Sequence, residues 1–565
     1  MKNFTIILTI LIALSITTNA QWTQIGNDID GEATGDLSGW SVSLSSDGSI
    51  VAVGAIGNSE NGYYAGHVRI YEYNSGYWSQ MGNDIDSEAA EDRFGSSVSL
   101  SSDGTIVAIG ASTNDGSIGH VRVYEYSGGN WVQKGNDIDG EAGGDHSGGS
   151  VSLSSDGSIL AIGASGNDGS GIDAGHVRVY EYSVSNWVQI GSDIDGEATE
   201  DYSGRSVSLS ADGLVLAVGA YGSDGNGENA GQVRIYEYSG GNWVQIGSDI
   251  DGEAAEDYSG ISVSLSSDGS ILAIGANGND GNDTINSKRG HVRIYEYSSG
   301  IWIQLGSDID GKTEDDRSGW SVSLSSDGSI VAIGAPAFYD TTSVNYVRVY
   351  EYIAGNWAQI GSDIYGEAVM DYSGWAVSLS SSGTVLAIGA YLNNGNGTEA
   401  GHVRVYYNCS INTIDTSVTQ NGDTLTANAV GAIYQWVVCD SSFAPISGET
   451  NQSFTPTSNG LYAVLISVNG CIDTSSCYNV TSIEKIDNNT EVSIYPNPTT
   501  GVIRINNEKL IINNVEVFDI YGKELLKSKI RSTKHEVDLS QQPKGIYIIK
   551  VTTNKGVAVE KVVLE

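Results

Sequence analysis

The stretch SVSLSADGLVLAVGA at residues 206–220, with QVRIYEY at 232–238 and WVQIG at 243–247, is the key to the architecture of this chain. Valine and leucine alternate with serine at its start, which predicts a strand with one apolar face. Asp212-Gly213 favours a tight hairpin, because this pair readily adopts the positive φ angles of a two-residue turn. The rest of the stretch and the two later segments predict three more strands. Four antiparallel strands per unit are typical of a β-propeller blade.

The unit recurs along the chain at intervals of 53 to 59 residues, the spacing expected for stacked supersecondary units. The pattern Trp-x-Gln-x-Gly begins at Trp22, Trp78, Trp131, Trp187, Trp243, Trp302 and Trp357. The motif of the first strand begins at Ser41, Ser97, Ser150, Ser206, Ser262, Ser321 and Ala376.

The first and last units complement each other. The last unit has its third strand at 402–407 but no Trp-x-Gln strand after it, whereas an orphan copy at 22–26 precedes the first unit. Closure of a ring would join the two and remove the exposed sheet edges of an open array. We therefore predict an all-β chain with a seven-bladed β-propeller at residues 21–407, closed by the N-terminal strand. An open solenoid is the alternative.

The blade resembles the FG-GAP repeat of the integrin α-subunit propeller. Residues 94–100 (FGSSVSL) match its FG end, 332–336 (AIGAP) its GAP end, and 175–180 (GHVRVY) the strand that follows. Integrin-type blades often bind calcium in an Asp-rich hairpin between the first two strands. Here that hairpin is Ser-Ser-Asp-Gly, as at residues 45–48, and offers one carboxylate. The resemblance therefore implies the fold but not that calcium site.

The N-terminus predicts a signal peptide at residues 1–20. Lys2 precedes an apolar run that is too short for a membrane span, and Thr18-Asn19-Ala20 is a small-residue cleavage site. A membrane anchor is the alternative. The formal net charge of −42 disfavours nucleic acid and anionic membrane surfaces as partners.

Residues 408–483 predict an Ig-like β-sandwich and contain all four cysteines, Cys409, Cys439, Cys471 and Cys477. Clustered cysteines in an exported chain favour disulfides over metal ligation, and three pairings are possible. Tyr434-Gln-Trp436 and Asn459-Gly-Leu-Tyr462 resemble the Ig-like modules of exported Bacteroidetes proteins. Such modules are usually spacers.

After a polar linker at 484–490, residues 491–565 predict a small β-sandwich. The segments VSIYPNP at 492–498, VEVFDIYG at 515–522 and GIYIIKV at 545–551 resemble the type A C-terminal sorting domain of the type IX secretion system. The resemblance implies export through the periplasm to the outer-membrane surface or the medium, with the secretion machinery as a partner. An ordinary small sandwich is the alternative.

The most regular polar feature follows each fourth strand, where Asp-x-Asp-Gly-Glu supplies carboxylates at alternate positions. Hard cations such as Ca²⁺ take several oxygen ligands from this kind of spacing. Calcium is the one cofactor that this pattern suggests, and the alternative is that these acids cap turns and solvate one face. The candidate ligands are Asp28, Asp30, Glu32, Asp36, Asp193, Asp195, Glu197, Asp201, Asp249, Asp251, Glu253 and Asp257.

No catalytic constellation is visible in the sequence. Near-identical repeats supply a symmetric ring of carboxylates, whereas catalysis needs an asymmetric group with unlike environments. We therefore expect a non-enzymatic, monomeric binding or adhesion protein, secreted or on the cell surface, that presents an acidic face to a protein or polysaccharide. A secreted propeller hydrolase or lyase and a structural matrix component are the alternatives. An enzyme should show unique polar residues from one or two blades in a central pocket.

Overall fold

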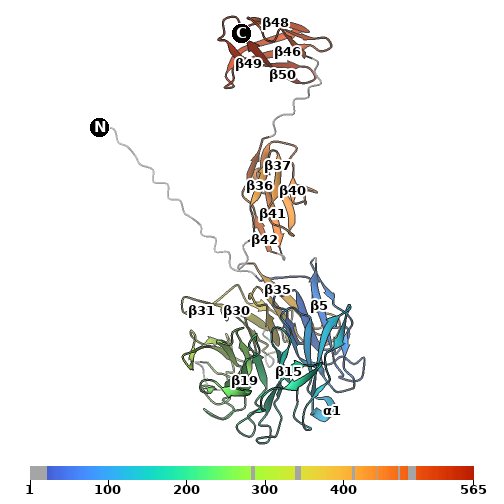
Figure 1. Cartoon of the computed structure of the whole chain (residues 1–565), viewed down its shortest axis with the longest axis vertical. Coiled ribbons are helices and arrows are strands. Elements are labelled where there is room, and N and C mark those ends of the chain that lie inside the picture. Colours follow the sequence, from blue (N-terminus) through green and yellow to red (C-terminus); the bar gives the residue numbers. More distant parts are fainter. Residues whose placement is uncertain are drawn as a thin grey trace, which may run out of the picture. The chain divides into compact units, whose positions relative to one another are not determined.

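The structure is a computed structural model and is almost entirely β (Figure 1). It describes residues 22–74, 76–281, 287–337, 345–409, 414–441, 443–468, 471–481 and 492–565. The predicted signal peptide and linker lie outside these residues. The chain divides into two compact units, one of residues 1–414 with 467–472 and one of residues 415–466 with 473–565, and each is described by itself.

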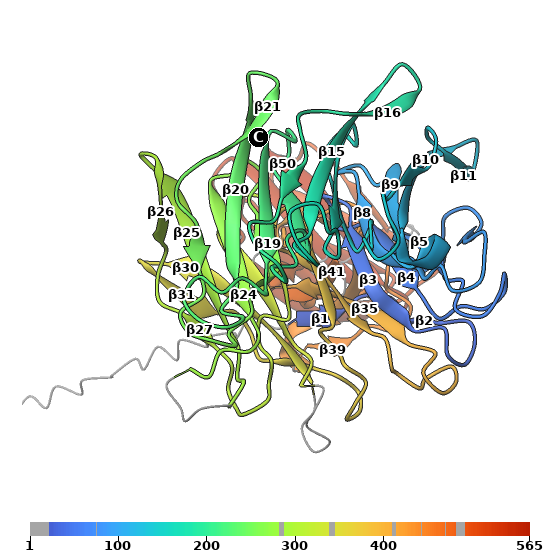
Figure 2. The same cartoon turned by 90° about the horizontal axis from the view of Figure 1, so that it is seen from below.

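The first unit contains seven five-stranded sheets among its described residues, the number predicted (Figures 1 and 2). The first strands are β3 (Ser38–Leu44), β8 (Phe94–Leu100), β13 (Ser150–Leu153), β18 (Ser206–Leu209), β23 (Ser259–Leu265), β28 (Ser321–Leu324) and β33 (Ala376–Leu379). The second strands are β4 (Ile50–Ala55), β9 (Ile106–Ala111), β14 (Ile159–Ala164), β19 (Val215–Ala220), β24 (Ile271–Ala276), β29 (Ile330–Ala335) and β34 (Val385–Ala390). The third strands are β5 (His67–Asn74), β10 (His120–Ser127), β15 (His176–Ser183), β20 (Gln232–Ser239), β25 (His291–Ser298), β30 (Tyr346–Ile353) and β35 (His402–Asn408).

Each third strand pairs with two further segments. The fourth strands are β6 (Tyr77–Gln80), β11 (Asn130–Gln133), β16 (Asn186–Gln189), β21 (Asn242–Gln245), β26 (Ile301–Gln304), β31 (Asn356–Gln359) and β1 (Trp22–Gln24). A short fifth strand, which the sequence did not predict, pairs with the beginning of the same third strand. These fifth strands are β7 (Ile85–Asp86), β12 (Ile138–Asp139), β17 (Ile194–Asp195), β22 (Ile250–Asp251), β27 (Ile309–Asp310), β32 (Ile364–Tyr365) and β2 (Ile29–Asp30).

The ring closes as predicted. Strand β1 pairs with β35, with Trp22 opposite Asn408, and completes the seventh sheet (Figure 2). The Trp22 side chain is buried among Ile388 and Tyr406 of that sheet, and its Nε1 donates to the carbonyl of Ile360. First strands contact their neighbours around the ring, and β33 contacts β3. An open solenoid is thereby excluded.

Backbone hydrogen bonds between successive hairpins form a ring around the propeller axis. This ring lies at the end of the propeller where the first strand of each sheet turns into the second. The backbone N–H of each hairpin donates to the carbonyl of the next at 2.8 Å, and Ser381 donates back to Ser46. The members are Ser46, Ser102, Ser155, Ala211, Ser267, Ser326 and Ser381.

The opposite end of the propeller carries the long loops and is called the loop end. It is formed by residues 25–37 and 56–66 of the first repeat and by their equivalents; the short helix α1 (Asn114–Ser117) lies in one of them.

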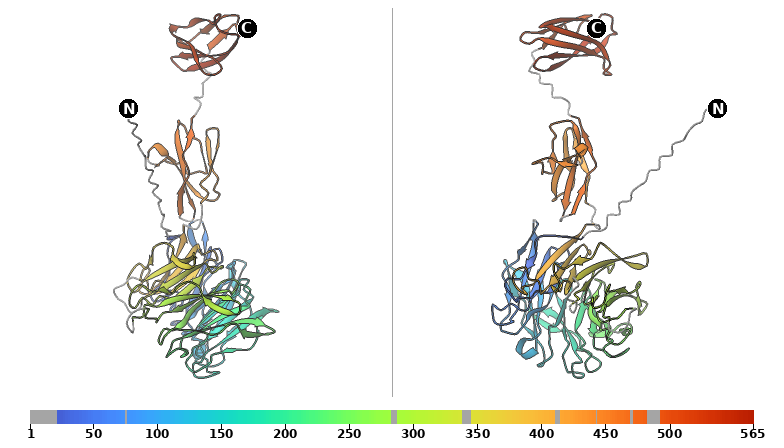
Figure 3. Two further views of the ribbon diagram at one scale, coloured as in Figure 1. Left: turned by 90° about the vertical axis from the view of Figure 1, so that its left-hand side faces the viewer. Right: turned by 180° about the vertical axis from the view of Figure 1, so that it is seen from behind.

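Both faces of each sheet are buried because every sheet packs between two others. Val233 and Ile235 of β20 share a cluster with Leu272 and Ile274 of the next sheet. The second strand needs its glycine for this approach, since a Cβ on Gly219 would lie 2.1 Å from the carbonyl oxygen of Gly260. Figure 3 shows the packed sheets from two further sides.

Residues after the propeller form two more pairs of sheets. One pair consists of β36 (Val418–Asn421), β37 (Thr424–Ala427) and β40 (Ser453–Phe454), and of β38 (Ile433–Val438), β39 (Ala444–Pro445), β41 (Gly460–Val468), β42 (Cys471–Thr474) and β43 (Tyr478–Val480). Trp436 is fully buried and stacks on Phe454, with 5.2 Å between ring centroids. Of the three possible pairings, the structure has the disulfides Cys409–Cys471 and Cys439–Cys477.

The last sheets are β44 (Val492–Tyr495), β45 (Val502–Asn507) and β48 (Lys534–Asp538), and β46 (Ile512–Phe518), β47 (Glu524–Ser532), β49 (Gly545–Thr553) and β50 (Val557–Leu564). Ile503, Val515, Ile549 and Val562 are buried in one cluster that joins both sheets. Among the described residues, no helix has the length and apolar character needed to cross a bilayer.

Candidate functional site

The predicted acidic ligands divide into groups with different contacts. Asp36 is buried and its carboxylate accepts the backbone N–H groups of Glu32 and Ala33 at 2.9 and 2.8 Å. Asp201 and Asp257 make the same bonds in their repeats, and burial raises the pKa of both. These three carboxylates hold the loop in shape.

A second group explains the glutamine of the Trp-x-Gln pattern. Gln24 donates from Nε2 to Asp28 at 2.6 Å, and Asp193 and Asp249 receive the same bond from the glutamine four residues earlier. One oxygen of each carboxylate thus accepts a hydrogen bond from the glutamine of its own repeat.

The remaining candidates bind arginines of the third strands. Glu32 lies 3.3 Å from Arg69, which also donates to the carbonyl of Asp30 at 2.7 Å. Arg234 contacts Glu197 and the carbonyl of Asp195, and Arg293 contacts Glu253 and the carbonyl of Asp251. Each arginine thus links its sheet to the preceding one.

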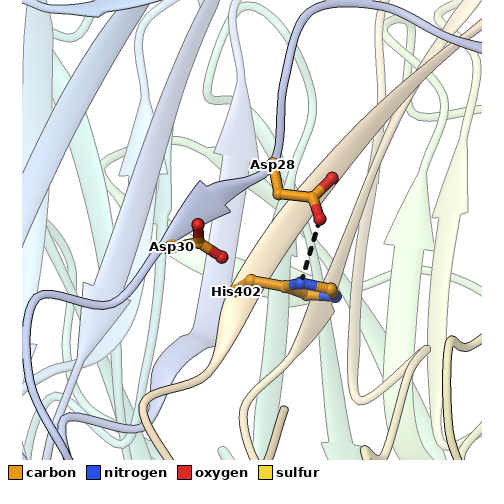
Figure 4. A group of neighbouring side chains, drawn as sticks. All are labelled: Asp28, Asp30 and His402. Atoms are coloured by element: carbon orange, nitrogen blue, oxygen red, sulfur yellow. Dashed lines mark ion pairs between the residues drawn. The ribbon is translucent and has the colours of Figure 1, made fainter. Parts of the chain in front are cut away.

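A histidine at the beginning of a third strand lies beside these acids. His402 lies opposite Asp30 across β35 and β2, and its Nδ1 is 3.7 Å from Asp28 (Figure 4). Similar groups are formed by His67 with Glu32 and Asp84, by His120 with Asp137 and Asp139, by His176 with Glu141 and Asp193, and by His291 with Glu253 and Asp308. Sequence reasoning missed these groups because it did not predict the fifth strand, which pairs with the start of the third strand and so holds the acid one residue before it, such as Asp84, close to the histidine.

Burial lowers the pKa of all five histidines, which favours the neutral imidazole at pH 7. Burial lowers the pKa of His67, His291 and His402 to about 4. A neutral imidazole beside two carboxylates suits Zn²⁺ better than Ca²⁺, which prefers oxygen ligands throughout. Calcium binding by the twelve acids stays a prediction.

A different site lies at the loop end, where the beginnings of the seven first strands meet. A pocket of about 310 Å³ is lined by one residue from the same position of every repeat. These seven residues are Trp40, Ser96, Gly149, Arg205, Ile261, Trp320 and Trp375. The preceding residue is glycine in all seven repeats, and the following residue is serine in six, so the sequence varies at the position that lines the pocket.

Three neighbouring sheets form an aromatic wall of the pocket. The ring centroids of Trp375 lie 4.5 Å from Trp320, 4.9 Å from Trp40 and 4.7 Å from Tyr391. The three tryptophans are partly exposed. They come from the sixth, seventh and first sheets, which adjoin in the ring.

The second, third and fourth sheets form a polar wall of the pocket. Its basic residues are Arg93, His146 and Arg205, accompanied by Ser96, Ser112 and Ser165. His146 Nδ1 lies 3.2 Å from the carbonyl of Ser112. Burial lowers the pKa of Arg205. No carboxylate is among the described residues that line this pocket.

The pocket contains the feature that the sequence analysis expected of an enzyme, since His146 and Arg205 are polar residues unique to the third and fourth blades. The sequence alone did not locate them. Alignment of the seven repeats carries the signal, because Arg205 and Trp375 occupy a variable position between invariant glycine and serine or alanine. What the alignment lacks is the knowledge that this position faces the axis in every sheet.

The comparisons with known proteins identify two parts of the chain. Residues 493–565 match the family described as secretion system C-terminal sorting domain, and residues 193–236 match the FG-GAP repeat. No curated protein is detectably similar in sequence.

Two solved structures have limited similarity to the chain. One is a candidate 6-phosphogluconolactonase of Bacteroides uniformis, with 14% identity and a TM-score of 0.41 over 59% of this chain and 86% of the other. The second is the periplasmic gluconolactonase of Pseudomonas aeruginosa, with 14% identity and a TM-score of 0.41 over 75% of this chain and 98% of the other.

The matched tail is the signature of type IX secretion, which delivers proteins to the cell surface or the extracellular space. The chain therefore carries an FG-GAP repeat within its propeller and ends in a type IX secretion sorting domain.

Proposed function

We propose that the chain is a non-enzymatic binding protein of the cell surface or extracellular space, whose propeller engages a protein or polysaccharide at the loop end. The observation that supports this best is the pocket where the beginnings of the seven first strands meet, called the axial pocket. Each of the seven repeats contributes its variable residue there, while the surrounding framework repeats. Its volume lies at the lower end of the range for ligand pockets, about 300–1,000 Å³.

The chemistry of the lining favours binding over catalysis. Glycoside hydrolysis usually needs two carboxyl groups beside the bond that breaks, and no carboxylate is among the described lining residues. His146 lines the pocket, and histidine is the residue most used in general acid–base catalysis. Its Nδ1, however, lies beside a backbone carbonyl and not beside a carboxylate that would orient the ring. Tryptophan faces and arginines are, in contrast, common anchors of binding sites.

The test is binding of the purified full chain to arrays of extracellular polysaccharides and proteins, read by tryptophan fluorescence. We expect saturable binding by the parent chain and loss of binding in Trp375→Ser. Serine already stands at the equivalent position Ser96, so the fold should accept it. Chromatography of the ligand after incubation separates the two classes of function: an intact ligand agrees with the proposal, and shortened products contradict it.

A further inference from the structure

The pocket has two unlike walls, and together they specify a type of ligand. The aromatic wall of Trp40, Trp320 and Trp375 offers partly exposed ring faces. Such faces pack against flat, apolar surfaces such as the C–H face of a sugar ring. The polar wall offers guanidinium groups and serines, which donate hydrogen bonds to oxygen atoms.

Arg205 differs from the arginines of the third strands. Arg69, Arg234 and Arg293 each contact a glutamate and donate to a backbone carbonyl. Within the described part of the chain, the guanidinium of Arg205 has neither an ion pair nor a hydrogen bond, and its principal electrostatic neighbour is Tyr221. An arginine in a recessed pocket without a carboxylate is suited to bind an anionic group, which it can hold with two parallel hydrogen bonds.

Arg93 extends the cationic wall outward. It is exposed, packs over Tyr64 and lines both the axial pocket and a neighbouring groove of about 620 Å³. The groove is lined by Tyr63 and Tyr64, by residues 89–93 and by Thr113, Asp115, Gly116 and Ser117, so it also contains the carboxylates of Glu91, Asp92 and Asp115. A polymer that continues from the pocket into this groove meets these carboxylates, so its anionic group belongs in the pocket, where no carboxylate is among the described lining residues.

We propose that the axial pocket binds an acidic sugar residue of an extracellular polysaccharide, with its ring against Trp375 and its carboxylate or sulfate group on Arg205. This inference rests on the proposed function and specifies its ligand. The net charge of −42 does not prevent it, because repulsion from acids elsewhere is screened beyond about 8 Å at physiological ionic strength, whereas the contact with Arg205 is direct.

The experiment is a titration of the purified full chain, by calorimetry, with three oligosaccharides of equal length. One carries carboxylates (an oligogalacturonate), one carries sulfates (a sulfated galactan fragment), and one is neutral (a β-1,4-glucan). We expect at least one acidic oligosaccharide to bind at least tenfold more tightly than the neutral one. The carboxylate and sulfate arms show which anionic group is preferred.

Two variants and one control identify the residues responsible. Arg205→Ser should weaken acidic binding roughly 10- to 100-fold and leave binding of the neutral sugar unchanged, since a charge-assisted pair is lost. Trp375→Ser should weaken the affinity for every oligosaccharide that binds to the parent chain. Both changes introduce the serine that Ser96 already has at this position. Arg531→Ser removes the same charge from an exposed site in the sorting domain and should change nothing.

The outcomes separate the inference from the proposed function. Equal binding of acidic and neutral sugars that is lost in Trp375→Ser overturns the acidic ligand but keeps a binding pocket. An acidic preference that survives Arg205→Ser also overturns the inference. If no sugar binds, the inference fails, and the arrays of polysaccharides and proteins then decide the proposed function independently. A thermal melt of each variant shows whether it has folded.

Discussion

At the scale of single residues, the repeated polar groups of the loops mostly build the framework. Asp36 binds backbone N–H groups, Asp28 binds Gln24, and Glu32 pairs with Arg69. The sequence predicted where these acids recur but not that their partners lie in the same loop or in the adjacent sheet. His402 is the clearest case, because its acidic neighbours are Glu367 of the preceding repeat and residues 28–30, at the other end of the propeller sequence.

The buried histidines make stability dependent on pH. His402 has a pKa of about 4 in the folded chain, below the ordinary value of 6.5, so the unfolded chain binds more protons between these values. Its contribution is therefore fully present above pH 6.5 and is lost as the pH falls toward 4. We expect urea unfolding of the propeller to show a smaller loss of stability between pH 7 and pH 5 in His402→Gln than in the parent.

The fourth sheet already has Gln232 at the position equivalent to His402, so the His402→Gln variant should fold. Burial raises the pKa of Asp30, which acts in the opposite sense, and the difference between variant and parent isolates the histidine. His535→Gln in the sorting domain is the control. An identical pH dependence in His402→Gln and the parent would show that the imidazole is not responsible.

The calcium hypothesis has a separate test. A cation that binds only the folded state must raise the melting temperature. The hypothesis predicts a higher melting temperature of the full chain in excess calcium, reversed by a chelator and reduced in Asp195→Asn. A melting temperature unmoved by both additions would remove it, and a rise with zinc alone would assign the ion to the histidine groups.

At the scale of elements, one three-residue strand closes the ring. Strand β1 supplies the fourth strand of the seventh sheet and covers the edge of β35, which would otherwise present unpaired backbone groups. The sequence predicted this pairing from the orphan copy at 22–26. It did not predict the fifth strands, because two residues such as Ile29–Asp30 are too few to show an alternating pattern.

Deletion of residues 22–30 should therefore destabilise the propeller and promote association through β35. Loss of the buried Trp22 alone is expected to cost about 3–5 kcal/mol, as for other large aromatic side chains. Adding a peptide of residues 22–30 in trans should restore the urea midpoint in a concentration-dependent way. The same peptide with Thr23→Pro cannot pair fully and should not. A truncated chain as stable as the parent would mean that closure contributes nothing.

At the scale of the whole molecule, the residues that repeat build the framework, and the residues that vary line the pocket. Interdigitating sheets and the ring of hairpin bonds from Ser46 to Ser381 use residues that repeat, whereas the pocket uses the position that varies. The sorting domain belongs to a separate sequence family at residues 493–565 and indicates export.

Deletion of residues 491–565 should leave the protein in the periplasm of its host. The type IX machinery recognises the sorting domain, so the truncated chain should cross the inner membrane and stop. Immunoblots of periplasmic, surface and culture fractions check this, with Arg531→Ser as an exported control. Appearance of the truncated chain at the surface or in the medium would contradict the assignment.

The repeat, the strands, the closure by residues 22–26 and the secretion tail could all be predicted before any coordinates, because local alternation, turn chemistry and motifs are read along the chain. The disulfide pairing, the histidine–acid groups and the pocket needed the three-dimensional fold. Each of these joins residues far apart in the chain, such as Trp40 with Trp375, and their proximity follows from the packing of seven sheets around one axis.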